Sequence, residues 1–327
     1  MKPFKTGLVG LGNMGKYHLQ SLQQDADFNV VAAVDPDEAR LAPVRETAKV
    51  FRDYKELADL DLDCVVVAAP TQTHYTIAKF FLDRGINVLV EKPAATTVPE
   101  SQDLVATAKK KGVKLCVGHV ERCNPVVKIA KKIISEGVIG RPLHSHSMRV
   151  GHYPGSVHAS NNVIIDLAVH ELDVLATMFG PVQLRSTYGR KVRHQDICDM
   201  GEIFAVTESG TSALMHVNWL SPFKQRKMRV MGSGGVMELD YMHQECEVFA
   251  PQLPKMTFPD ADVSAVQDPK LGDKLFIKCH RQHPIYNQLQ QFSAYLSGNE
   301  HNLCAMDDIV DSIRVLEHAQ KFLEIGK

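Results

Sequence analysis

Long apolar runs are missing from this sequence, and so is any excess of charge of one sign. No run approaches the ~18 consecutive apolar residues that a membrane-spanning helix needs. Lys and Arg together number 37 against 38 Asp and Glu, whereas nucleic-acid-binding proteins usually carry a basic excess. The first residues also lack the apolar core and small-residue cleavage site of a signal peptide. The sequence therefore predicts a cytoplasmic protein with no nucleic-acid partner and no membrane partner.

Cysteine is scarce and follows no pattern. The chain has 7 cysteines, an odd number, and it contains no Cys-x-x-Cys motif. We therefore expect reduced and mostly buried thiols rather than a disulfide framework or a zinc site. The rest of the composition is ordinary for a globular protein. With 327 residues, 44% hydrophobic and 23% charged, the chain is long enough for one large or two smaller domains, each with its own core.

The first part of the chain alternates between apolar segments and helical patterns. Strands are predicted at 4–10, 28–35, 64–68, 87–90 and 114–118. Helices are predicted after the first strand up to residue 24, and at 37–48, 72–84 and 99–111. The apolar segments are continuous rather than alternating, which indicates strands buried on both faces. The sequence thus predicts an α/β domain in which helices cover both faces of a doubly wound parallel sheet.

A glycine-rich turn joins the first strand to the first helix. It consists of Gly10, Leu11, Gly12, Asn13, Met14 and Gly15. In this context the three glycines permit a tight turn, close approach of the backbone to a pyrophosphate, and close helix–strand packing. The helix N-terminus adds backbone amides and a positive dipole. Asp35 ends the second strand, where a carboxylate binds ribose hydroxyls and repels a 2′-phosphate. NAD is therefore expected in preference to NADP, and an ordinary glycine cluster is the alternative.

Three further strand ends carry candidate cofactor-binding residues, most of them polar. Ligands of doubly wound sheets bind at the carboxyl ends of the strands, so we expect these residues to surround the cofactor. They are Pro70, Thr71, His74, Glu91, Lys92 and His119. Lys92 precedes a proline, which favours an extended backbone at the lysine. A solvated surface lysine is the alternative interpretation of Lys92.

The hydrophobic period changes in the second part of the chain. Strands are predicted at 143–151, 182–190, 201–208, 211–219, 225–232, 235–240 and 244–250, several of them alternating. Short turns between consecutive strands indicate a largely antiparallel sheet. Residues 251–273 are rich in proline and polar residues and predict a long loop. Helices are predicted at 283–298 and 304–325.

Residues 162–179 are too apolar for a surface helix and predict a buried one. At ~3.6 residues per turn, five polar residues share one narrow stripe. They are Asn162, Asp166, His170, Asp173 and Thr177. Asp166 and His170 are spaced i, i+4, so their side chains are neighbours. Three interpretations are open: a structural Asp–His hydrogen bond, a metal site for which no third ligand is evident, and a general base oriented by a carboxylate. We favour the last and predict no metal.

Together these residues resemble the glucose–fructose oxidoreductase/inositol dehydrogenase/MocA family of NAD(P)-dependent dehydrogenases, over essentially the whole chain. The resemblance rests on Gly10-x-Gly12-x-x-Gly15, Asp35, Glu91-Lys92-Pro93 and Asp166-x-x-x-His170 followed by Asp173. It implies a Rossmann domain at 1–122 and an α/β domain with a large, mostly antiparallel open sheet at 123–303. It also implies a C-terminal helix at 304–327 that packs back on the first domain, and a homodimer or homotetramer formed through the open sheet.

Two segments resemble a narrower subgroup, the UDP-N-acetylglucosamine 3-dehydrogenases. They are Gly118-His119-Val120-Glu121-Arg122-Cys123-Asn124-Pro125 and Val163-Ile164-Ile165-Asp166-Leu167-Ala168-Val169-His170. An aromatic residue is more usual in the subgroup where Cys123 stands. The resemblance implies oxidation of a sugar hydroxyl to a ketone, at C3 of a UDP-N-acetylhexosamine. An inositol or simple-sugar dehydrogenase of the same family is one alternative, and a non-catalytic NAD or sugar sensor is another.

The resemblance also implies roles for individual residues. His170 accepts the hydroxyl proton, Asp166 orients His170, and Lys92 stabilises the developing alkoxide. Some members of the family are better described with the lysine as the base, so both assignments of the base stay open. A nucleotide sugar needs further contacts for its diphosphate. The candidates by position are Arg122, Arg149, Tyr153 and His158.

Overall fold

The computed structural model describes residues 2–154, 162–251, 253, 256–267, 272–321 and 323–326. It divides into two compact units. Residues 1–123 and 283–314 form the first unit, and residues 124–282 and 315–327 form the second. Residues 283–303, expected in the second domain, thus belong to the first unit. Among the described residues, no helix combines the length and the apolarity needed to cross a membrane.

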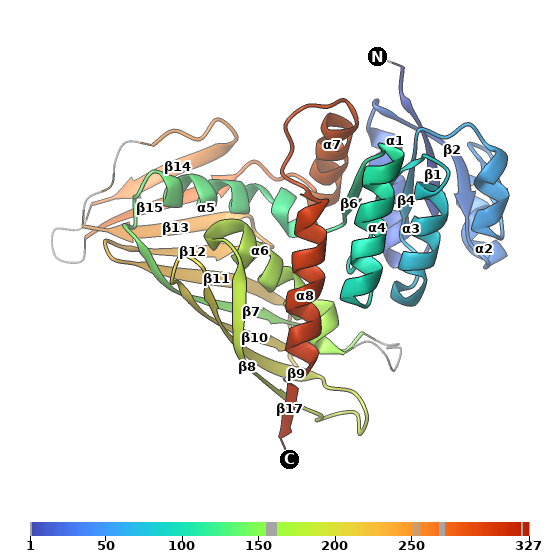
Figure 1. Cartoon of the computed structure of the whole chain (residues 1–327). Helices are drawn as coiled ribbons and strands as arrows, with labels where there is room; N and C mark the ends of the chain where they lie inside the picture. Colours follow the sequence, from blue (N-terminus) through green and yellow to red (C-terminus); the bar gives the residue numbers. More distant parts are fainter. Residues whose placement is uncertain are drawn as a thin grey trace. The chain divides into compact units, whose positions relative to one another are not determined.

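The first unit is built on a seven-stranded sheet (Figure 1). Its strands are β1 (Phe4–Val9), β2 (Phe28–Val34), β3 (Lys49–Phe51), β4 (Cys64–Val67), β5 (Asn87–Val90), β6 (Leu115–Val117) and β16 (Cys304–Ala305). Their order is β16-β6-β5-β4-β1-β2-β3, and all neighbours are parallel except β16, which is antiparallel to β6. The predicted doubly wound Rossmann sheet is therefore confirmed.

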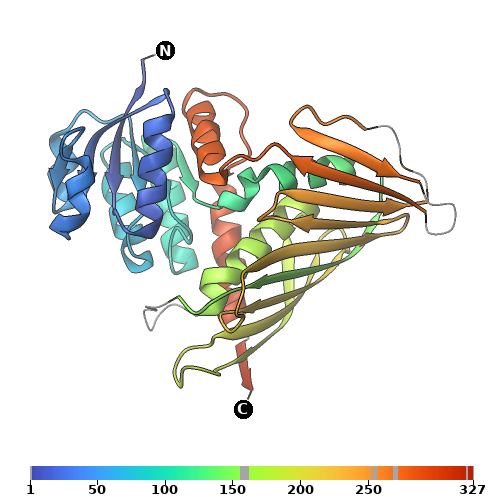
Figure 2. The ribbon, with the colours of Figure 1, turned by 180° about the vertical axis from the view of Figure 1, so that it is seen from behind.

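Helices cover both faces of this sheet. Helices α3 (His74–Leu82) and α4 (Val98–Lys111) lie on the face seen in Figure 1. Helices α1 (Asn13–Gln24) and α7 (Pro284–Leu296) pack together on the other face, where Figure 2 shows α1. Strand β4 serves both layers, because Val65 and Val67 belong to the core under α3 and α4 while Cys64 and Val66 belong to the core under α1 and α7. This burial on both faces explains why the strand is continuously apolar.

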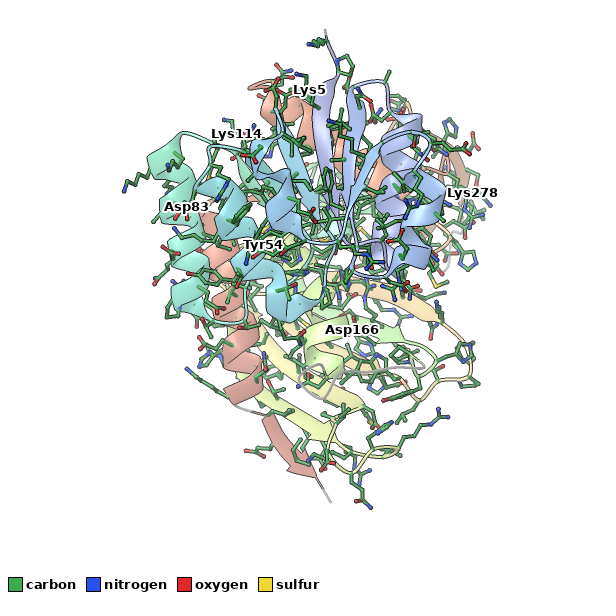
Figure 3. All side chains as sticks on the ribbon, turned by 90° about the vertical axis from the view of Figure 1, so that its right-hand side faces the viewer. Lys5, Tyr54, Asp83, Lys114, Asp166 and Lys278 are labelled. Carbon is green, nitrogen blue, oxygen red and sulfur yellow. The ribbon has the colours of Figure 1, made fainter. Side chains whose placement is uncertain are left out.

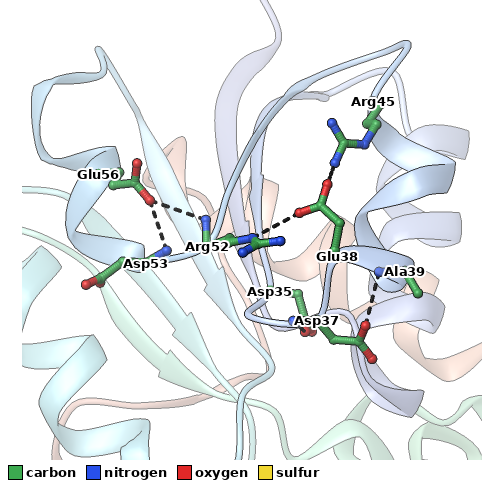
Figure 4. Close-up of polar contacts among 8 residues, drawn as sticks. All are labelled: Asp35, Asp37, Glu38, Ala39, Arg45, Arg52, Asp53 and Glu56. Atoms are coloured by element: carbon green, nitrogen blue, oxygen red, sulfur yellow. Dashed lines mark hydrogen bonds and ion pairs between the residues drawn. The ribbon is translucent and has the colours of Figure 1, made fainter.

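The connection from β2 to β4 differs from the predicted helix at 37–48. The chain forms the short helix α2 (Glu38–Leu41) and the 3₁₀ turn η1 (Ala42–Val44), and then adds the strand β3. Pro43 lies in the 3₁₀ turn and has no backbone N–H to donate, which disfavours a longer α-helix. Figure 4 shows Glu38 contacting Arg45 and Arg52 beyond the turn.

Three further 3₁₀ turns shape the loops of the first unit. They are η2 (Tyr54–Asp59), η3 (Thr71–Thr73) and η4 (Val120–Cys123). The turn η2 is fixed by a capping box: the Asp53 side chain accepts from the backbone while the Glu56 side chain accepts the Asp53 N–H at 3.1 Å (Figure 4). The turns η3 and η4 follow β4 and β6 at the edge where the candidate site residues lie.

The second unit is built on a ten-stranded sheet. Its strands are β7 (Pro142–Val150), β8 (Val182–Arg190), β9 (Met200–Thr207), β10 (Ser212–Asn218), β11 (Gln225–Gly232), β12 (Val236–Asp240), β13 (Glu245–Ala250), β14 (Ala261–Val266), β15 (Asp273–Cys279) and β17 (Leu323–Gly326). Their order is β14-β15-β13-β12-β11-β7-β10-β9-β8-β17. Neighbours are antiparallel except β7 with β10 and β8 with β17. The predicted large, mostly antiparallel sheet is confirmed.

One face of this sheet packs against helices. They are α5 (Pro125–Ser135), the π-helical turn η5 (Ile164–Ala168) and α6 (Val169–Phe179). Burial alternates along the central strands: in β10, Ala213, Met215 and Val217 enter the core under the helices. The residues between them point to the opposite face, whose strands are seen in Figure 2. This alternation is typical of an antiparallel sheet with one buried face.

Four described elements of the second unit were not expected: α5, β14, β15 and β17. The sequence analysis predicted no helix at the residues of α5. It also predicted a loop over 251–273, within which the structure describes β14, and β15 follows. The helix predicted at 304–325 is α8 (Asp307–Lys321), and β17 comes after it. The division between the two units falls inside α8, whose residue Ile309 packs in the core of the first unit.

Candidate active site

The glycine-rich turn leaves no space for side chains at two of its positions. Gly10 has a φ of +93°, and a Cβ there would lie 2.4 Å from the carbonyl oxygen of Ala68. A Cβ on Gly15 would lie 2.0 Å from the carbonyl oxygen of Gly10. Gly12 is the N-cap of α1, and no side chain caps that end of the helix. The first amides of α1, on Asn13 and Met14, are thus suited to an anion such as a pyrophosphate.

Asp35 stands beside this turn with both carboxylate oxygens engaged. Its Oδ2 accepts the N–H of Leu11 at 2.7 Å, and its Oδ1 accepts the N–H of Asp37 at 2.9 Å. The Nη1 atom of Arg40 lies 3.7 Å from Asp35 Oδ2, and Arg40 Nε lies 3.2 Å from Asp37 Oδ2. Arg40, which sequence reasoning missed, therefore brings a half-exposed cation to the carboxylate expected at the ribose. Arg40 lies three residues after Asp37 at the start of a predicted helix, and this i,i+3 spacing could have indicated a cation at this place.

His74 follows β4, as expected, and its ring contacts two backbone carbonyl groups. It is 1% exposed, and its ring nitrogens lie 2.8 Å from the carbonyl oxygens of Ala69 and Pro93. The side chain therefore ties the end of β4 to the segment after β5. Pro70 and Thr71 begin the turn η3 between these two contacts. These two contacts hold the strand ends in place, and contact of His74 with the cofactor stays a prediction.

Glu91 and Lys92 follow β5. Glu91 is 6% exposed, and its Oε1 lies 2.7 Å from Nε2 of His18 on α1. Its Oε2 accepts the backbone N–H of Lys92 at 3.2 Å. Burial raises the pKa of Glu91, but the hydrogen bond and charge of His18, together with Lys92 and His74, outweigh it and lower the pKa below its ordinary value. Glu91 is therefore a carboxylate at neutral pH. His119, after β6, is buried.

In the second unit, Asp166 and His170 lie on a helix that changes its winding. Asp166 belongs to the π-helical turn η5 and His170 to α6, so the uniform 3.6-residue stripe predicted from the sequence does not hold through this segment. The Asn162 side chain accepts the N–H groups of Ile164 and Ile165 at the start. Both Asp166 and His170 are half-buried. π-helical turns occur frequently at functional sites, which agrees with the interpretation of this segment.

Trp219 contacts Asp166, which is labelled in Figure 3, and two further aromatic rings pack next to the indole. The indole N–H of Trp219 donates to Asp166 Oδ2 at 3.3 Å. Tyr153 meets the Trp219 ring edge-on, with centroids 5.7 Å apart, and stacks on the His194 ring at 4.8 Å. Trp219 and His194 were missed by sequence reasoning. Trp219 is the single tryptophan of the chain, and its place at the end of the predicted strand 211–219 was the available signal.

Two arginines expected to bind a diphosphate have other partners. Arg122 donates from Nη1 to Oδ2 of Asp308 at 2.7 Å within the first unit, and it is 8% exposed. Arg149 donates from Nε to Oε1 of Glu171 at 2.7 Å within the second unit, and it is 1% exposed. Each guanidinium group thus has an ion-pair partner within its own unit, and its contact with a diphosphate stays a prediction. His158 lies outside the described residues.

The residues of the first unit gather as the sequence predicts at one edge of its sheet. The glycine turn, Asp35, His74, Glu91, Lys92 and His119 all follow the carboxyl ends of parallel strands. A turn closed to side chains, an uncapped helix start and a buried carboxylate fit the pyrophosphate and ribose of NAD. The fold and this edge define a dinucleotide-binding oxidoreductase.

Comparisons with known proteins give the family. The profile described as "Oxidoreductase family, NAD-binding Rossmann fold" matches residues 4–119, and that of the "GFO/IDH/MocA C-terminal domain" matches residues 127–238. The chain belongs to the Gfo/Idh/MocA family of oxidoreductases, and it is an NAD(P)-dependent dehydrogenase with an NAD-binding Rossmann domain.

Several relatives have assigned activities. The chain is 23% identical to UDP-N-acetylglucosamine 3-dehydrogenase of Acidithiobacillus ferrooxidans, over 75% of this chain and 76% of that protein. It is 28% identical to inositol 2-dehydrogenase/D-chiro-inositol 3-dehydrogenase of Lactiplantibacillus plantarum, over 73% and 72%. The solved structure of the Acidithiobacillus enzyme has a TM-score of 0.82 at 19% identity, with 99% of both chains covered. KijD10, a 3-ketoreductase from Actinomadura kijaniata solved with NADP and TDP-benzene, has a TM-score of 0.83 at 17% identity, covering 99% of this chain and 98% of that one.

Proposed function

We propose that this dehydrogenase oxidises a secondary hydroxyl of a sugar to a ketone, and that its substrate is a UDP-N-acetylhexosamine oxidised at C3. The support comes from the segments 118–125 and 163–170, which resemble the UDP-N-acetylglucosamine 3-dehydrogenases. The Acidithiobacillus relative, which bears that name, agrees with them.

The observation that carries the reaction type is the pair Asp166 and His170. Both are half-buried on one helix, and Asp166 is held by the Trp219 indole at 3.3 Å. In the proposed step, His170 accepts the hydroxyl proton while the C–H hydrogen leaves with its bonding electrons and the C=O bond forms. NAD, when bound, accepts this hydride. Lys92 stabilises the negative charge that develops on the substrate oxygen.

Further residues are proposed to contact the substrate. Tyr153 presents an aromatic ring stacked on His194, and aromatic faces suit the packing of sugar and base rings. His158 keeps its proposed role as a diphosphate contact. Arg122 and Arg149 stay proposed as diphosphate contacts, although each also has an ion-pair partner within its own unit.

A second candidate is an inositol or a simple sugar as substrate. Two observations favour it: a 28% identical relative is an inositol dehydrogenase, and both arginines expected to neutralise a diphosphate are engaged elsewhere. The same three residues would perform the same oxidation on this substrate. The two candidates therefore differ in the substrate and not in the chemistry.

The experiment incubates the purified protein with NAD⁺ and UDP-N-acetylglucosamine, and in parallel with myo-inositol and a panel of free hexoses. Mass spectrometry follows the loss of two hydrogen atoms from each candidate, and absorbance follows NADH. We expect oxidation of the nucleotide sugar by the wild type. His170→Ala and Lys92→Met are expected to lower the rate about 100-fold or more while NAD still binds. Lys110→Met, on the exposed side of α4, is the matched control and keeps the rate.

Each other outcome overturns a named part of the proposal. Oxidation of inositol or a free hexose alone replaces the substrate and keeps the mechanism. Oxidation that survives both His170→Ala and Lys92→Met removes the proposed roles of these residues. If NAD binds but none of the compounds is oxidised, the chain is better described as a cofactor or sugar sensor.

We also propose that the chain forms a homodimer or homotetramer through the ten-stranded sheet and acts in the cytoplasm. On the face away from the helices, the large apolar side chains that the described residues expose include Phe204, Leu214, Met231 and Phe249. Such a patch supports association with a second copy. All seven cysteines are thiols, as in a reducing compartment. Light scattering tests the assembly, and Leu214→Glu, opposite Phe204 in the adjoining strand, is expected to yield monomers.

A further inference from the structure

A buried pair of side chains joins the helix of the glycine turn to the end of β5. His18 lies three residues after Gly15 on α1, and its Nε2 is 2.7 Å from Oε1 of Glu91. The two side chains are 1% and 7% exposed. We propose that His18 is a positioning residue, which through the Glu91 carboxylate fixes the backbone of Lys92. This inference rests on the role that the proposed function gives to Lys92.

The Glu91 carboxylate connects two segments with its two oxygens. Oε1 faces His18, and Oε2 accepts the N–H of Lys92 at 3.2 Å. The backbone of Glu91 is itself fixed by its N–H bond to the carbonyl oxygen of Val67 on β4, at 2.8 Å. A carboxylate with each oxygen on a different element restrains both elements at once. The peptide that carries the Lys92 side chain is therefore linked to α1.

The carboxylate is also confined by its surroundings. A Cβ on Gly118, at the end of β6, would lie 3.0 Å from Cδ and Oε1 of Glu91. Glycine at this position is what allows the carboxylate to sit against β6. Glu91 is only 6% exposed, so its carboxylate has little access to water if its partner on α1 is removed. Loss of His18 therefore leaves a buried carboxylate to find a new arrangement, and the Lys92 N–H bond changes with it.

Only one ring nitrogen of His18, Nε2, has a hydrogen-bond partner among the described residues. Its Nδ1 is buried and has no hydrogen-bond partner among the residues that the structure describes. Glu91 is therefore the polar group that selects its orientation. A glutamine at position 18 places an amide N–H at the same number of bonds from Cα as Nε2 of histidine, so it can restore the bond. A leucine fills similar space and offers no donor.

Helix α1 begins at the glycine-rich turn, so the contacts of His18 with Glu91 connect this turn to Lys92. Gly12, Asn13 and Met14 start α1, and His18 lies in its second turn. The segment that holds the pyrophosphate and the peptide of Lys92 are thus parts of one hydrogen-bonded arrangement. We expect removal of His18 to affect the chemical step more than NAD affinity, because the glycine turn itself is unchanged.

The test compares His18→Leu and His18→Gln with Leu104→Ala. Leu104 is fully buried in the core under α3 and α4, on the other face of the sheet from α1 and His18, so it controls for lost stability. Hydrogen exchange at the Lys92 amide is measured against the Val90 amide in β5, and rapid mixing measures the rate of NADH formation. In His18→Leu we expect about tenfold faster relative exchange at Lys92 and about tenfold slower NADH formation, with NAD affinity changed less than about threefold. His18→Gln restores both toward wild type.

Two results overturn the inference. One is relative exchange at Lys92 that is the same in His18→Leu and wild type. The other is a slower chemical step in Leu104→Ala that equals the one in His18→Leu, since the role would then be structural. The exchange measurement needs no sugar, so it separates failure of this inference from failure of the proposed substrate. Loss of oxidation in every protein, with fast exchange in His18→Leu alone, overturns the proposed function and keeps the link.

Discussion

The guanidinium of Arg149 donates from Nε to Oε1 of Glu171 over 2.7 Å inside the second unit. Arg149 belongs to β7 and Glu171 to α6, so the pair joins the sheet to the helix that carries His170. The two side chains are 1% and 0% exposed, and the Tyr241 ring lies 5.6 Å from the guanidinium carbon. Water is thus excluded from a charge pair that holds the candidate catalytic helix.

Removing one member of this pair should be strongly destabilising. Arg149→Met leaves the Glu171 carboxylate buried without its cation, for which we expect a loss of about 3–5 kcal/mol in the free energy of unfolding. Adding Glu171→Met removes the stranded charge, so the double variant should recover part of the loss. Denaturant titration of the two variants and wild type measures this. A single variant as stable as wild type would contradict it.

Asp35 should contribute to the affinity for NAD, and Arg40 should contribute to the affinity for NADP. Asp35→Asn removes the negative charge beside Leu11 and keeps one acceptor oxygen, so we expect weaker NAD binding by about tenfold and less discrimination against NADP. Arg40→Ala removes the nearby cation and should weaken NADP binding while NAD binding stays close to wild type. Fluorescence titrations with NADH and NADPH give the four affinities. Equal effects of both substitutions on both cofactors would contradict this assignment.

The Rossmann half of the fold could be predicted because its strands bury both faces. Val65, Val66 and Val67 read as a continuous apolar run, and β4 lies where that run predicts it. The prediction of a helix at 37–48 was wrong, because the local composition favours a helix but Pro43 disfavours its continuation. The strand β3 was missed because three residues are too few to show a hydrophobic period. Helix α5 did carry a signal that was missed. Asn124 caps it, and Val126, Ile129 and Ile133 repeat at helical spacing.

The residues of the candidate site could likewise be predicted only in part. Residues after strand ends could be predicted, because parallel strands deliver them to one edge whatever their distance in sequence. The partners of single charges could not be predicted. Arg122 bonds to Asp308, 186 residues away, and nothing in the local sequence around Arg122 indicates that contact. The π-helical turn at Asp166 could not be predicted either, since the sequence period alone favours a regular helix.

The cysteines should differ sharply in reactivity. Six are buried and Cys123 is half-buried. Burial raises the pKa of Cys64 to about 12 and that of Cys279 to about 11, so neither forms appreciable thiolate at neutral pH. We expect iodoacetamide to add to Cys123 first in the native protein and to all 7 cysteines after denaturation. Mass spectrometry of the adducts checks this, and Cys123→Ala should stay unlabelled over the same time. Simultaneous labelling of several cysteines in the native state would contradict it.

Lowering the pH should destabilise the folded protein in part by protonating Glu91. The pKa of Glu91 in the folded protein lies below its ordinary value of 4.5, because His18, Lys92 and His74 outweigh the effect of burial. A carboxyl of this kind stabilises the fold fully above the unfolded pKa, and that contribution is lost as the pH falls through the folded pKa. The wild type should therefore lose stability progressively below about pH 4.5.

Glu91→Gln separates this contribution from general acid unfolding. Glutamine cannot ionise, so the variant should be less stable than wild type near neutral pH, and the difference should shrink as the pH falls below 4.5. The free energy of unfolding of both proteins, measured by denaturant at intervals from about pH 6 to about pH 3, gives the two curves. Curves that keep a constant separation through the acid range would show that protonation of Glu91 is not coupled to folding.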